Sequence, residues 1–254
     1  AQEIIDLAQE YGACLRNNKA AAIRLNYGMQ RTKGGGNAVR AVLSLPALIG
    51  AWRHAAGGAL LSSSSANVAR SAALQRPDLA KVRRRVINMT TIGDDLLRES
   101  SEQWGPAIEA MIIFNSNPAA IAPESGKVVQ GLARENLFTV VLEHFLTDTT
   151  DYADYVFPAT TQLEHWDIHK AYGHTDVLLN KPAIAPLGQA KSNTEFFRLL
   201  AREMGLCQGE MTAIFTESDE SLCKTAFDGL IDWKVINTQG FVHSSSNDAP
   251  FAKG

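Results

Sequence analysis

The sequence is poor in cysteine and has no long hydrophobic run. Its three cysteines are Cys14, Cys207 and Cys223. The number is odd and no CxxC or CxxxC pair occurs, so neither a disulfide framework nor an iron–sulfur cluster is expected within this chain. No apolar run reaches the roughly 18 residues that a membrane-spanning helix needs. The cysteines are therefore interpreted as ordinary core or surface thiols.

Neither sign of charge dominates the composition. The 24 basic and 27 acidic residues give a net charge of −3. Proteins that coat nucleic-acid phosphates usually carry a basic excess, so nucleic acid is not an expected partner. One basic run, KVRRR at 81–85, is short and lacks interleaved aromatics, which favours a solvated segment. Hydrophobic residues at 45% exclude a mostly disordered chain.

Several common catalytic and nucleotide-binding motifs are missing. Neither GxGxxG nor GxxxxGK[ST] occurs, which excludes the usual NAD and ATP fingerprints. HExxH and HxxEH are absent, and the six histidines show no Ser-His-Asp or Cys-His order. The chain begins inside a helical pattern without methionine and without a signal-like start, so we expect a piece of a longer protein whose compartment is unknown.

The spacing of apolar residues predicts strands that alternate with helices. Helices are expected over 1–16, 37–49, 125–134, 193–204 and 220–227, and strands over 20–25, 108–114, 138–142 and 155–157. Residues 50–80 are small and polar and are interpreted as a long loop. Ser192 and Glu195 form a capping box for the helix that begins at 193. This order predicts an α/β fold with a doubly wound, mostly parallel sheet.

Polar clusters follow two of the predicted strands. Asn115–Pro118 ends one strand and precedes a helix, so its backbone N–H groups can face a phosphate. Glu143 ends the next strand, with Thr147 and Thr149 close behind. A carboxylate there can accept hydrogen bonds from ribose hydroxyls or from the N1–H and N2–H edge of a guanine. Because ligands bind beyond the carboxyl ends of such strands, a nucleotide-type site is one interpretation, and ordinary turn chemistry is the other.

A second polar cluster contains Glu164, His165, His169 and His174. His165 and His169 are four residues apart, which is one helical turn, so with His174 or Glu164 they could bind a divalent transition metal. A ligand-contacting loop and a satisfied surface cluster are the alternatives.

A third cluster, Gly28, Gln30 and Arg31 with Gly34–Gly36, follows the first predicted strand. Glycines there allow close backbone approach, and Arg31 or Lys33 could pair with a phosphate. A plain connection between a strand and a helix explains the same residues equally simply.

Four segments, in this order, resemble the molybdopterin oxidoreductases of the dimethyl sulfoxide reductase class. They are AIRLNYGMQRTKGGGNAVRAVLSLPALIGAWRHAAGG, MIIFNSNPAAIAP, FTVVLEHFLTDTTDYADYVFPATTQLEHWDIHKAYGH and GQAKSNTEFFRLLAREMG. The resemblance spans roughly residues 1–205, and 143–158 is its most specific part. It matches the family pattern acid-x-Phe-x-Thr-x-Thr followed by Ala-Asp and Pro.

The resemblance implies an incomplete part of a larger multi-domain enzyme. Such an enzyme holds molybdenum between two molybdopterin guanine dinucleotides, each at the edge of one α/β domain. Residues 1–75 would then end one cofactor-binding domain, 76–205 would form the second half of another, and 206–254 would lead toward a further domain. The molybdenum ligand would lie outside this chain, so we assign no catalytic residue and expect the segment alone to be inactive. Its partners would be the remaining domains and an electron-transfer subunit.

The resemblance also assigns residues to the cofactor. Asn117 and Pro118 fall in the phosphate loop, Glu143 takes the acidic guanosine position, and Gly28 and Gln30 match a loop near the second cofactor. The full set is Gly28, Gln30, Asn117, Pro118, Glu143, Phe145, Thr147, Thr149, Asp154, Glu164 and His174. Where many family members carry an arginine, this sequence reads Ala171-Tyr172-Gly173-His174, as in one branch of the class.

Two other functions fit the same pattern. One is a non-catalytic scaffold of the same fold in a redox complex, and the other is a metal-binding protein that uses His165, His169 and His174. Uncovered strand edges further predict self-association or marginal stability of this chain.

Overall fold

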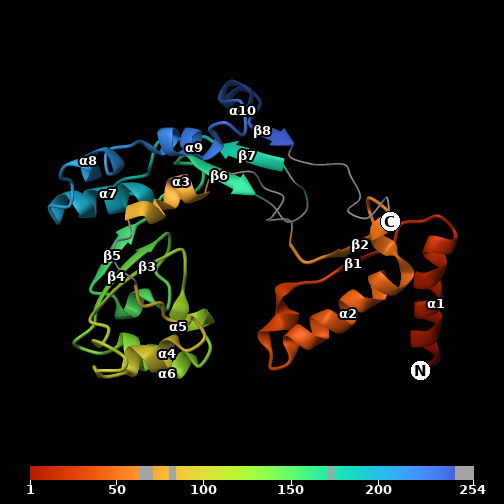
Figure 1. Ribbon diagram of the computed structural model, residues 1–254. Coiled ribbons are helices and arrows are strands. Elements are labelled where there is room, and N and C mark those ends of the chain that lie inside the picture. Colours follow the sequence, from red (N-terminus) through yellow and green to blue (C-terminus); the bar gives the residue numbers. More distant parts are fainter. Residues whose placement is uncertain (63–70, 80–83, 171–173, 175, 244–254) are drawn as a thin grey trace. The chain divides into compact units, whose positions relative to one another are not determined.

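The computed structural model describes residues 1–62, 71–79, 84–170, 174 and 176–243 (Figure 1). The chain forms two compact units. Unit 1 contains the described residues of 1–69, 169–178 and 234–254, and unit 2 contains those of 70–168 and 179–233. Unit 1 therefore combines three separate stretches of the sequence.

Unit 1 begins with helix α1 (Gln2–Arg16) and a parallel pair of strands, β1 (Ala22–Arg24) and β2 (Gly58–Leu60). Between the strands lie the 3-10 turn η1 (Tyr27–Arg31), helix α2 (Gly35–Ile49) and the 3-10 turn η2 (Ala51–Arg53). The prediction of a loop over 50–80 is wrong at three short helical segments, η2, α3 (Ser71–Gln75) and η4 (Pro77–Leu79), and at strand β2. This strand has only three residues, and its first residue is a glycine with φ of 103°, so it carries almost no alternating apolar signal.

A second sheet has the strand order β6 (Asp167–Lys170), β7 (Asp176–Asn180), β8 (Phe241–His243). Strands β7 and β8 are antiparallel, with Val177 opposite Val242. The helical turn expected between His165 and His169 is wrong, because His165 lies in a bend before β6 and His169 lies within that strand. The two histidines therefore do not share one face of a helix, which the expected metal site required.

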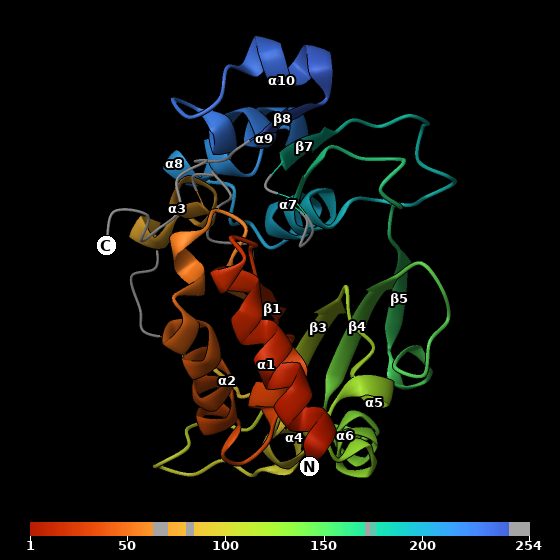
Figure 2. The same cartoon turned by 90° about the vertical axis from the view of Figure 1, so that its right-hand side faces the viewer.

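Unit 2 contains a three-stranded parallel sheet, shown in Figure 2 with its strands side by side. Its strands are β3 (Ala110–Phe114), β4 (Phe138–Glu143) and β5 (Tyr155–Pro158), with β4 in the centre. The connections contain helices α5 (Pro118–Ile121) and α6 (Ser125–Leu132) and the 3-10 turn η5 (Thr150–Tyr152). All three strands were predicted from the sequence, and the mixed α/β fold with parallel sheets is confirmed.

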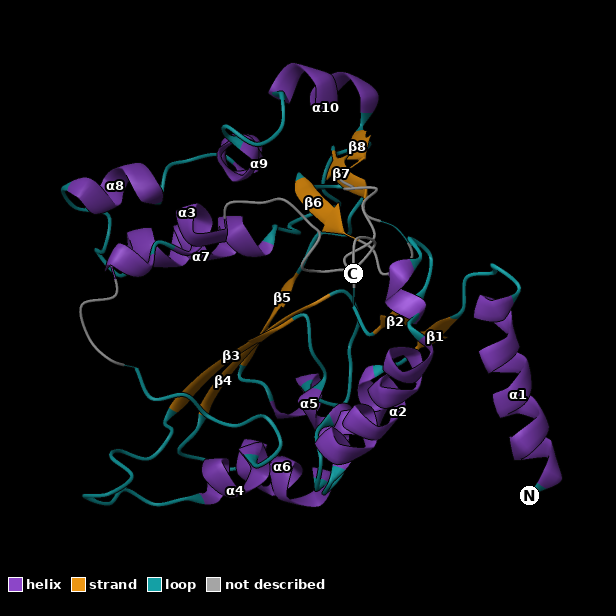
Figure 3. Ribbon diagram, turned by 45° about the vertical axis from the view of Figure 1, so that its right-hand side comes forward, coloured by secondary structure: helices purple, strands orange, loops and turns teal. Residues whose placement is uncertain are grey.

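One face of this sheet packs on α5, α6 and helix α4 (Ile92–Leu97), as Figure 3 shows. Ile113 and Val141 point from adjacent strands into a core with Leu96, Val128 and Leu132. Burial of each large apolar side chain here stabilises the unit by about 1.5–3 kcal/mol.

The opposite face of the sheet packs against helix α7 (Asn193–Glu203). The ring centroids of Phe114 and Phe197 are 5.3 Å apart, and those of Phe157 and Phe196 are 5.2 Å apart. The capping residue predicted for α7 is confirmed, because the Ser192 hydroxyl accepts the Glu195 N–H at 3.2 Å. Because the three strands are parallel, their carboxyl ends lie together at one edge of the sheet.

The remaining helical segments are short. They are α3 (Ser71–Gln75), η4 (Pro77–Leu79), α8 (Glu210–Ile214), α9 (Asp219–Phe227) and α10 (Trp233–Gln239). The start of α9 is joined to the start of α7 through Asp219, which accepts hydrogen bonds from Ser192 (2.9 Å), Thr194 (2.6 Å) and Arg198. Within the described parts of the chain, no helix combines the length and the apolar character that crossing a bilayer requires.

Candidate cofactor-binding site

The loops that follow β3 and β4 are joined by one side chain at the carboxyl edge of the unit 2 sheet. The Asn117 side-chain oxygen Oδ1 accepts hydrogen bonds from the Thr149 hydroxyl (2.6 Å) and the Thr149 N–H (3.2 Å). Its amide nitrogen donates to the Asp148 carboxylate at 3.0 Å. This hydrogen bond holds the pKa of Asp148 below its usual range. Asn117 and Thr149, which the sequence places 32 positions apart, therefore form one cluster.

Thr149 is the buried centre of this cluster, with 0% of its surface exposed. Besides its bond to Asn117, its hydroxyl oxygen accepts the Ala119 N–H at 3.1 Å. Pro118 is buried at the first position of α5, where a missing N–H has no cost. The Asn117 side chain fixes the two loops to each other. A ligand at this edge would therefore contact the other backbone and side-chain groups of these loops.

Glu143 lies at the last position of β4, opposite Pro158 of β5. Its Oε1 accepts the His144 N–H at 2.7 Å. Among the residues that the structure describes, no other group hydrogen-bonds to this half-buried carboxylate. One oxygen therefore remains able to accept hydrogen bonds from a bound molecule.

Glu164 is directed inward, with 7% of its surface exposed. Its carboxylate accepts the Thr161 N–H (2.8 Å), the Thr161 hydroxyl (2.9 Å) and the Leu187 N–H (2.6 Å). These hydrogen bonds, from the Thr161 backbone first, lower the pKa of Glu164. The residue thus stays ionised and locks the loop after β5 rather than facing solvent.

His144 connects this loop to the end of β4, a contact that no sequence motif indicated. Its Nε2–H donates to the Thr160 carbonyl at 2.9 Å, and the Thr160 hydroxyl hydrogen-bonds His165 Nδ1 at 2.8 Å. The neighbouring Phe145 is 76% exposed, so its ring is available to a partner surface. Thr147 Oγ1 is buried and has no hydrogen-bond partner within the described chain.

Asp154 lies at the other end of the sheet. Its carboxylate accepts the Thr139 N–H at 2.7 Å, and its own N–H donates to the Thr139 carbonyl at 2.8 Å. Thr139 is the second residue of β4, whereas Glu143 is the last. The structure therefore gives Asp154 the task of aligning β5 with β4 and does not bring it beside Glu143.

The glycine-rich loop of unit 1 is tight at a different position from the one expected. A Cβ at Gly28 would meet nothing within 4 Å, whereas a Cβ at Gly35 would lie 2.3 Å from the Met29 carbonyl oxygen. Gly28 and Gln30 both lie in η1 and are solvent-accessible. Close packing of η1 on the start of α2 thus depends on Gly35, which the sequence showed only as one glycine of a triplet.

Comparison with known proteins identifies the family. The model of the molybdopterin oxidoreductase family matches residues 2–203. The chain belongs to the molybdopterin oxidoreductase family. The resemblance seen in the sequence is thereby confirmed.

Individual relatives agree with this assignment. The chain is 42% identical over 228 residues to "Probable oxidoreductase YoaE" of Bacillus subtilis, covering 89% of this chain and 32% of the relative. It is 29% identical over 100 residues to "Trimethylamine-N-oxide reductase 1" of Escherichia coli, covering 38% of this chain and 12% of that protein. The chain thus spans about a third of the first relative's length.

A solved structure shares the fold. "Acetylene Hydratase from Pelobacter acetylenicus" matches 68% of this chain and 24% of its own, with a TM-score of 0.50 and 22% sequence identity. At this identity the match supports the α/β fold of the molybdopterin oxidoreductase chain and nothing more specific.

His174 belongs to unit 1, whereas the carboxyl-edge cluster is built from residues of unit 2. Its Nδ1 accepts the Asp176 N–H at 3.1 Å, and Asp176 also pairs with His243. Across the described residues, no group of three His, Cys, Asp or Glu side chains could hold a metal ion. The alternative of a metal site built from His165, His169 and His174 therefore has no support in the structure.

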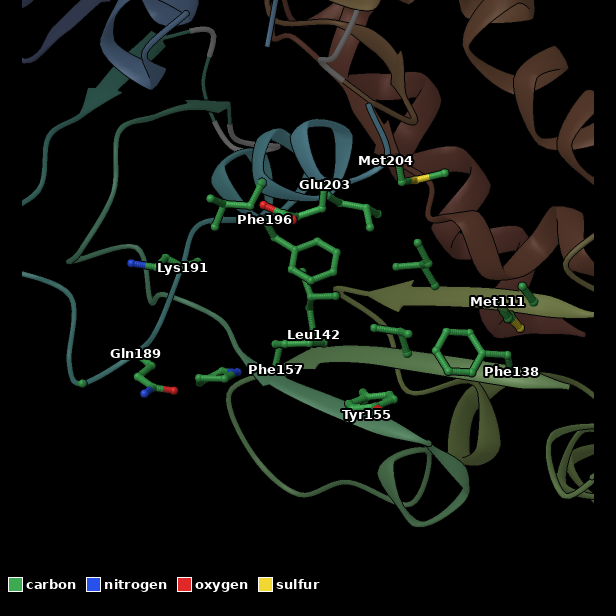
Figure 4. A pocket seen from close by; sticks show the side chains of 17 residues that line it. Met111, Phe138, Leu142, Tyr155, Phe157, Gln189, Lys191, Phe196, Glu203 and Met204 are labelled. Carbon is green, nitrogen blue, oxygen red and sulfur yellow. The ribbon is translucent and has the colours of Figure 1, made fainter. Parts of the chain in front are cut away.

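An apolar pocket of about 800 Å³ lies between the unit 2 sheet and α7 (Figure 4). Phe138 and Tyr155 line it from the sheet, and Phe196 and Met204 line it from the helix. Phe138 and Tyr155 lie at the amino ends of β4 and β5, whereas Leu142 and Pro158, which also line the pocket, lie at the carboxyl ends of these strands. The pocket therefore extends along this face of the sheet to the carboxyl edge.

Proposed function

We propose that this chain is the part of a molybdenum-dependent oxidoreductase that binds and orients molybdopterin guanine dinucleotide. Family membership supports a redox role that depends on a molybdenum–pterin cofactor. The observation that carries the more specific proposal is the cluster at the carboxyl edge of the unit 2 sheet. There Asn117 and Thr149 join two loops beside a glutamate with a free carboxylate oxygen.

The residues at this edge suit the guanosine end of the cofactor. The Glu143 carboxylate can accept the N1–H and N2–H donors of a guanine, a pattern that adenine does not offer. The buried Thr147 hydroxyl has no hydrogen-bond partner among the described residues and can take a hydrogen bond from the same ligand. Asn117 and Thr149 keep the two loops in register, so the donors and acceptors around them are pre-organised.

Six further residues are not proposed to contact the guanine base. They are Gly28, Gln30, Phe145, Asp154, Glu164 and His174. Glu164 holds the loop after β5, and Asp154 holds the start of that strand. Phe145 offers an exposed ring to the cofactor or to another domain. Gly28, Gln30 and His174 lie in unit 1, where they would approach the second dinucleotide.

The cofactor supplies two-electron or oxygen-atom chemistry when it is bound, while this chain supplies binding, orientation and electrostatics. No residue here is proposed as a catalytic acid or base. The relatives are about three times longer, so the molybdenum ligand, the substrate funnel and the electron-transfer partner are proposed to belong to other parts of the enzyme.

A thermal-shift titration with GDP tests the proposal, with ADP as the control nucleotide. Ligand at about 100 times its Kd adds about 2.7 kcal/mol to the stability of the folded state. We expect a shift with GDP that exceeds the shift with ADP and that Glu143→Gln abolishes. The matched control is Glu109→Gln, because Glu109 is an exposed acid directly before the amino end of β3, away from the carboxyl edge.

Equal shifts with the two nucleotides would indicate generic phosphate binding and contradict guanosine recognition. A GDP shift that survives Glu143→Gln would remove this residue from the site. The scaffold alternative makes a different prediction, since a full-length protein with no pterin or molybdenum after purification would favour it.

A further inference from the structure

The first residue of α7 lies above the carboxyl edge of the unit 2 sheet. The Lys191 N–H donates to the Pro158 carbonyl and the Thr160 N–H donates to the Lys191 carbonyl, both at 3.1 Å. These two bonds hold the chain before α7 next to the end of β5. Ser192 caps the helix, and Asn193 is its first residue.

Asn193 reaches from this point to the end of β3. Its side-chain amide nitrogen donates to the side-chain oxygen Oδ1 of Asn115 at 3.0 Å. Asn115 has φ of 54°, the left-handed region that asparagine tolerates better than most residues. It directly follows β3 and lies two residues before Asn117. Asn193 therefore borders the same loop that Asn117 joins to Thr149.

The oxygen of the Asn193 side-chain amide has no hydrogen-bond partner within the described chain. This atom, Oδ1, is buried. Buried polar atoms in folded proteins almost always have partners, so an orphaned acceptor beside a proposed ligand site points to a donor on the ligand. Thr147 Oγ1, in the loop after β4, is orphaned in the same way.

We propose that Asn193 is a further nucleotide-binding residue whose Oδ1 accepts a hydrogen bond from a sugar hydroxyl of the cofactor. This inference rests on the proposed function of the carboxyl edge. The chemistry selects the hydroxyl, because ionised phosphate oxygens carry no hydrogen to donate. The N–H donors of the guanine edge are already matched by Glu143, which leaves the ribose as the donor for a neutral amide oxygen.

Binding of GDP and of 2′,3′-dideoxy-GDP, measured by calorimetry on this chain, tests the proposal. For the unmodified chain we expect the dideoxy nucleotide to bind about 5- to 10-fold more weakly than GDP, the loss of one hydrogen bond. Asn193→Ala is expected to weaken GDP by the same factor and to leave dideoxy-GDP unchanged. Asn136→Ala is the matched control, because Asn136 is exposed and lies just before the amino end of β4.

Asn193→Asp keeps an oxygen acceptor at the same place, so it is expected to retain the preference for the ribose. This second variant also covers the case in which the alanine variant fails to fold. The proposal is overturned if Asn193→Ala still distinguishes the two nucleotides as the unmodified chain does, and in that case the guanosine site itself stands. Absence of GDP binding to the unmodified chain overturns both the site and the role of Asn193.

Discussion

Replacing Thr149 by valine tests whether the hydroxyl at the centre of the carboxyl-edge cluster holds the two loops together. Valine has nearly the same shape as threonine but neither donates nor accepts a hydrogen bond. The change removes the 2.6 Å bond to Asn117 and the 3.1 Å bond from the Ala119 N–H. Because Thr149 is 0% exposed, water cannot easily replace either bond.

The expected loss follows from the groups left unpaired. A buried N–H without an acceptor costs about 1–3 kcal/mol, and the Ala119 N–H loses its partner here. We therefore expect unit 2 to lose about 2 kcal/mol of unfolding free energy. For a domain of 150–250 residues this lowers Tm by roughly 4–8 °C. The stabilisation by GDP is expected to fall as well, since both loops lose their register.

Thr139→Val is the matched control for this change. Thr139 is also 0% exposed and lies in the same sheet, but its hydroxyl has no hydrogen-bond partner among the described residues. Removing an unpaired buried hydroxyl leaves the stability unchanged or raises it by up to about 1 kcal/mol. The same substitution is thus expected to destabilise unit 2 at Thr149 and not at Thr139.

Urea denaturation followed by circular dichroism measures both free energies. Equal losses at the two positions would show that valine is disfavoured for steric reasons alone. An unchanged stability in Thr149→Val would refute the argument that its hydrogen bonds join the loops. A change in the slope with urea would instead report altered compactness.

Three further outcomes are expected. Gly131→Ala places a Cβ 2.5 Å from the Leu96 Cβ and should cost about 1–2 kcal/mol in a melt, while Gly126→Ala in the same helix meets nothing within 4 Å and should be neutral or stabilising. Burial raises the pKa of Asp219, but hydrogen bonds from two hydroxyls and a guanidinium outweigh this effect and lower the pKa. The stabilisation of the fold by this carboxylate is therefore complete above about pH 4 and is lost as the pH falls through the lowered pKa. Asp219→Asn should remove this pH-dependent stabilisation, and a pH-independent difference in stability between the variant and the unmodified chain would contradict the argument. Burial raises the pKa of the Cys223 thiol to about 12. A thiol reagent at pH 8 should therefore label the other two cysteines first and Cys223 only after unfolding. Rapid labelling of Cys223 in the folded chain would contradict its burial.

The strands of unit 2 were predictable because their apolar residues are consecutive and their ends carry turn residues. Parallel strands covered on both faces need apolar side chains on both sides, and Phe138–Leu142 supplies them. The sequence placed Asn117 and Thr149 in the loops after two successive strands, but the hydrogen bonds between them are found only in the structure. Strand β2 escaped prediction because three residues beginning with glycine hold too little pattern.

The individual tasks of the site residues could not be read from the sequence. Asp154 fits the family pattern, yet its carboxylate is used by the backbone of Thr139. Whether a carboxylate meets a ligand or a backbone N–H depends on tertiary contacts that no local pattern encodes. The same reason explains why Gly35, rather than Gly28, is the glycine that packing requires.

The composition of unit 1 has a consequence for the order of events during protein synthesis. Strand β7 pairs with β8, and their facing residues Asp176 and His243 are 67 positions apart. At a synthesis rate of about 5–20 residues per second, β7 leaves the ribosome roughly 3–13 s before its partner exists. The β3–β4–β5 sheet is by then complete in sequence and can fold first. We therefore expect nascent chains that stop before β8 to protect the unit 2 sheet from protease while β7 is still cleaved.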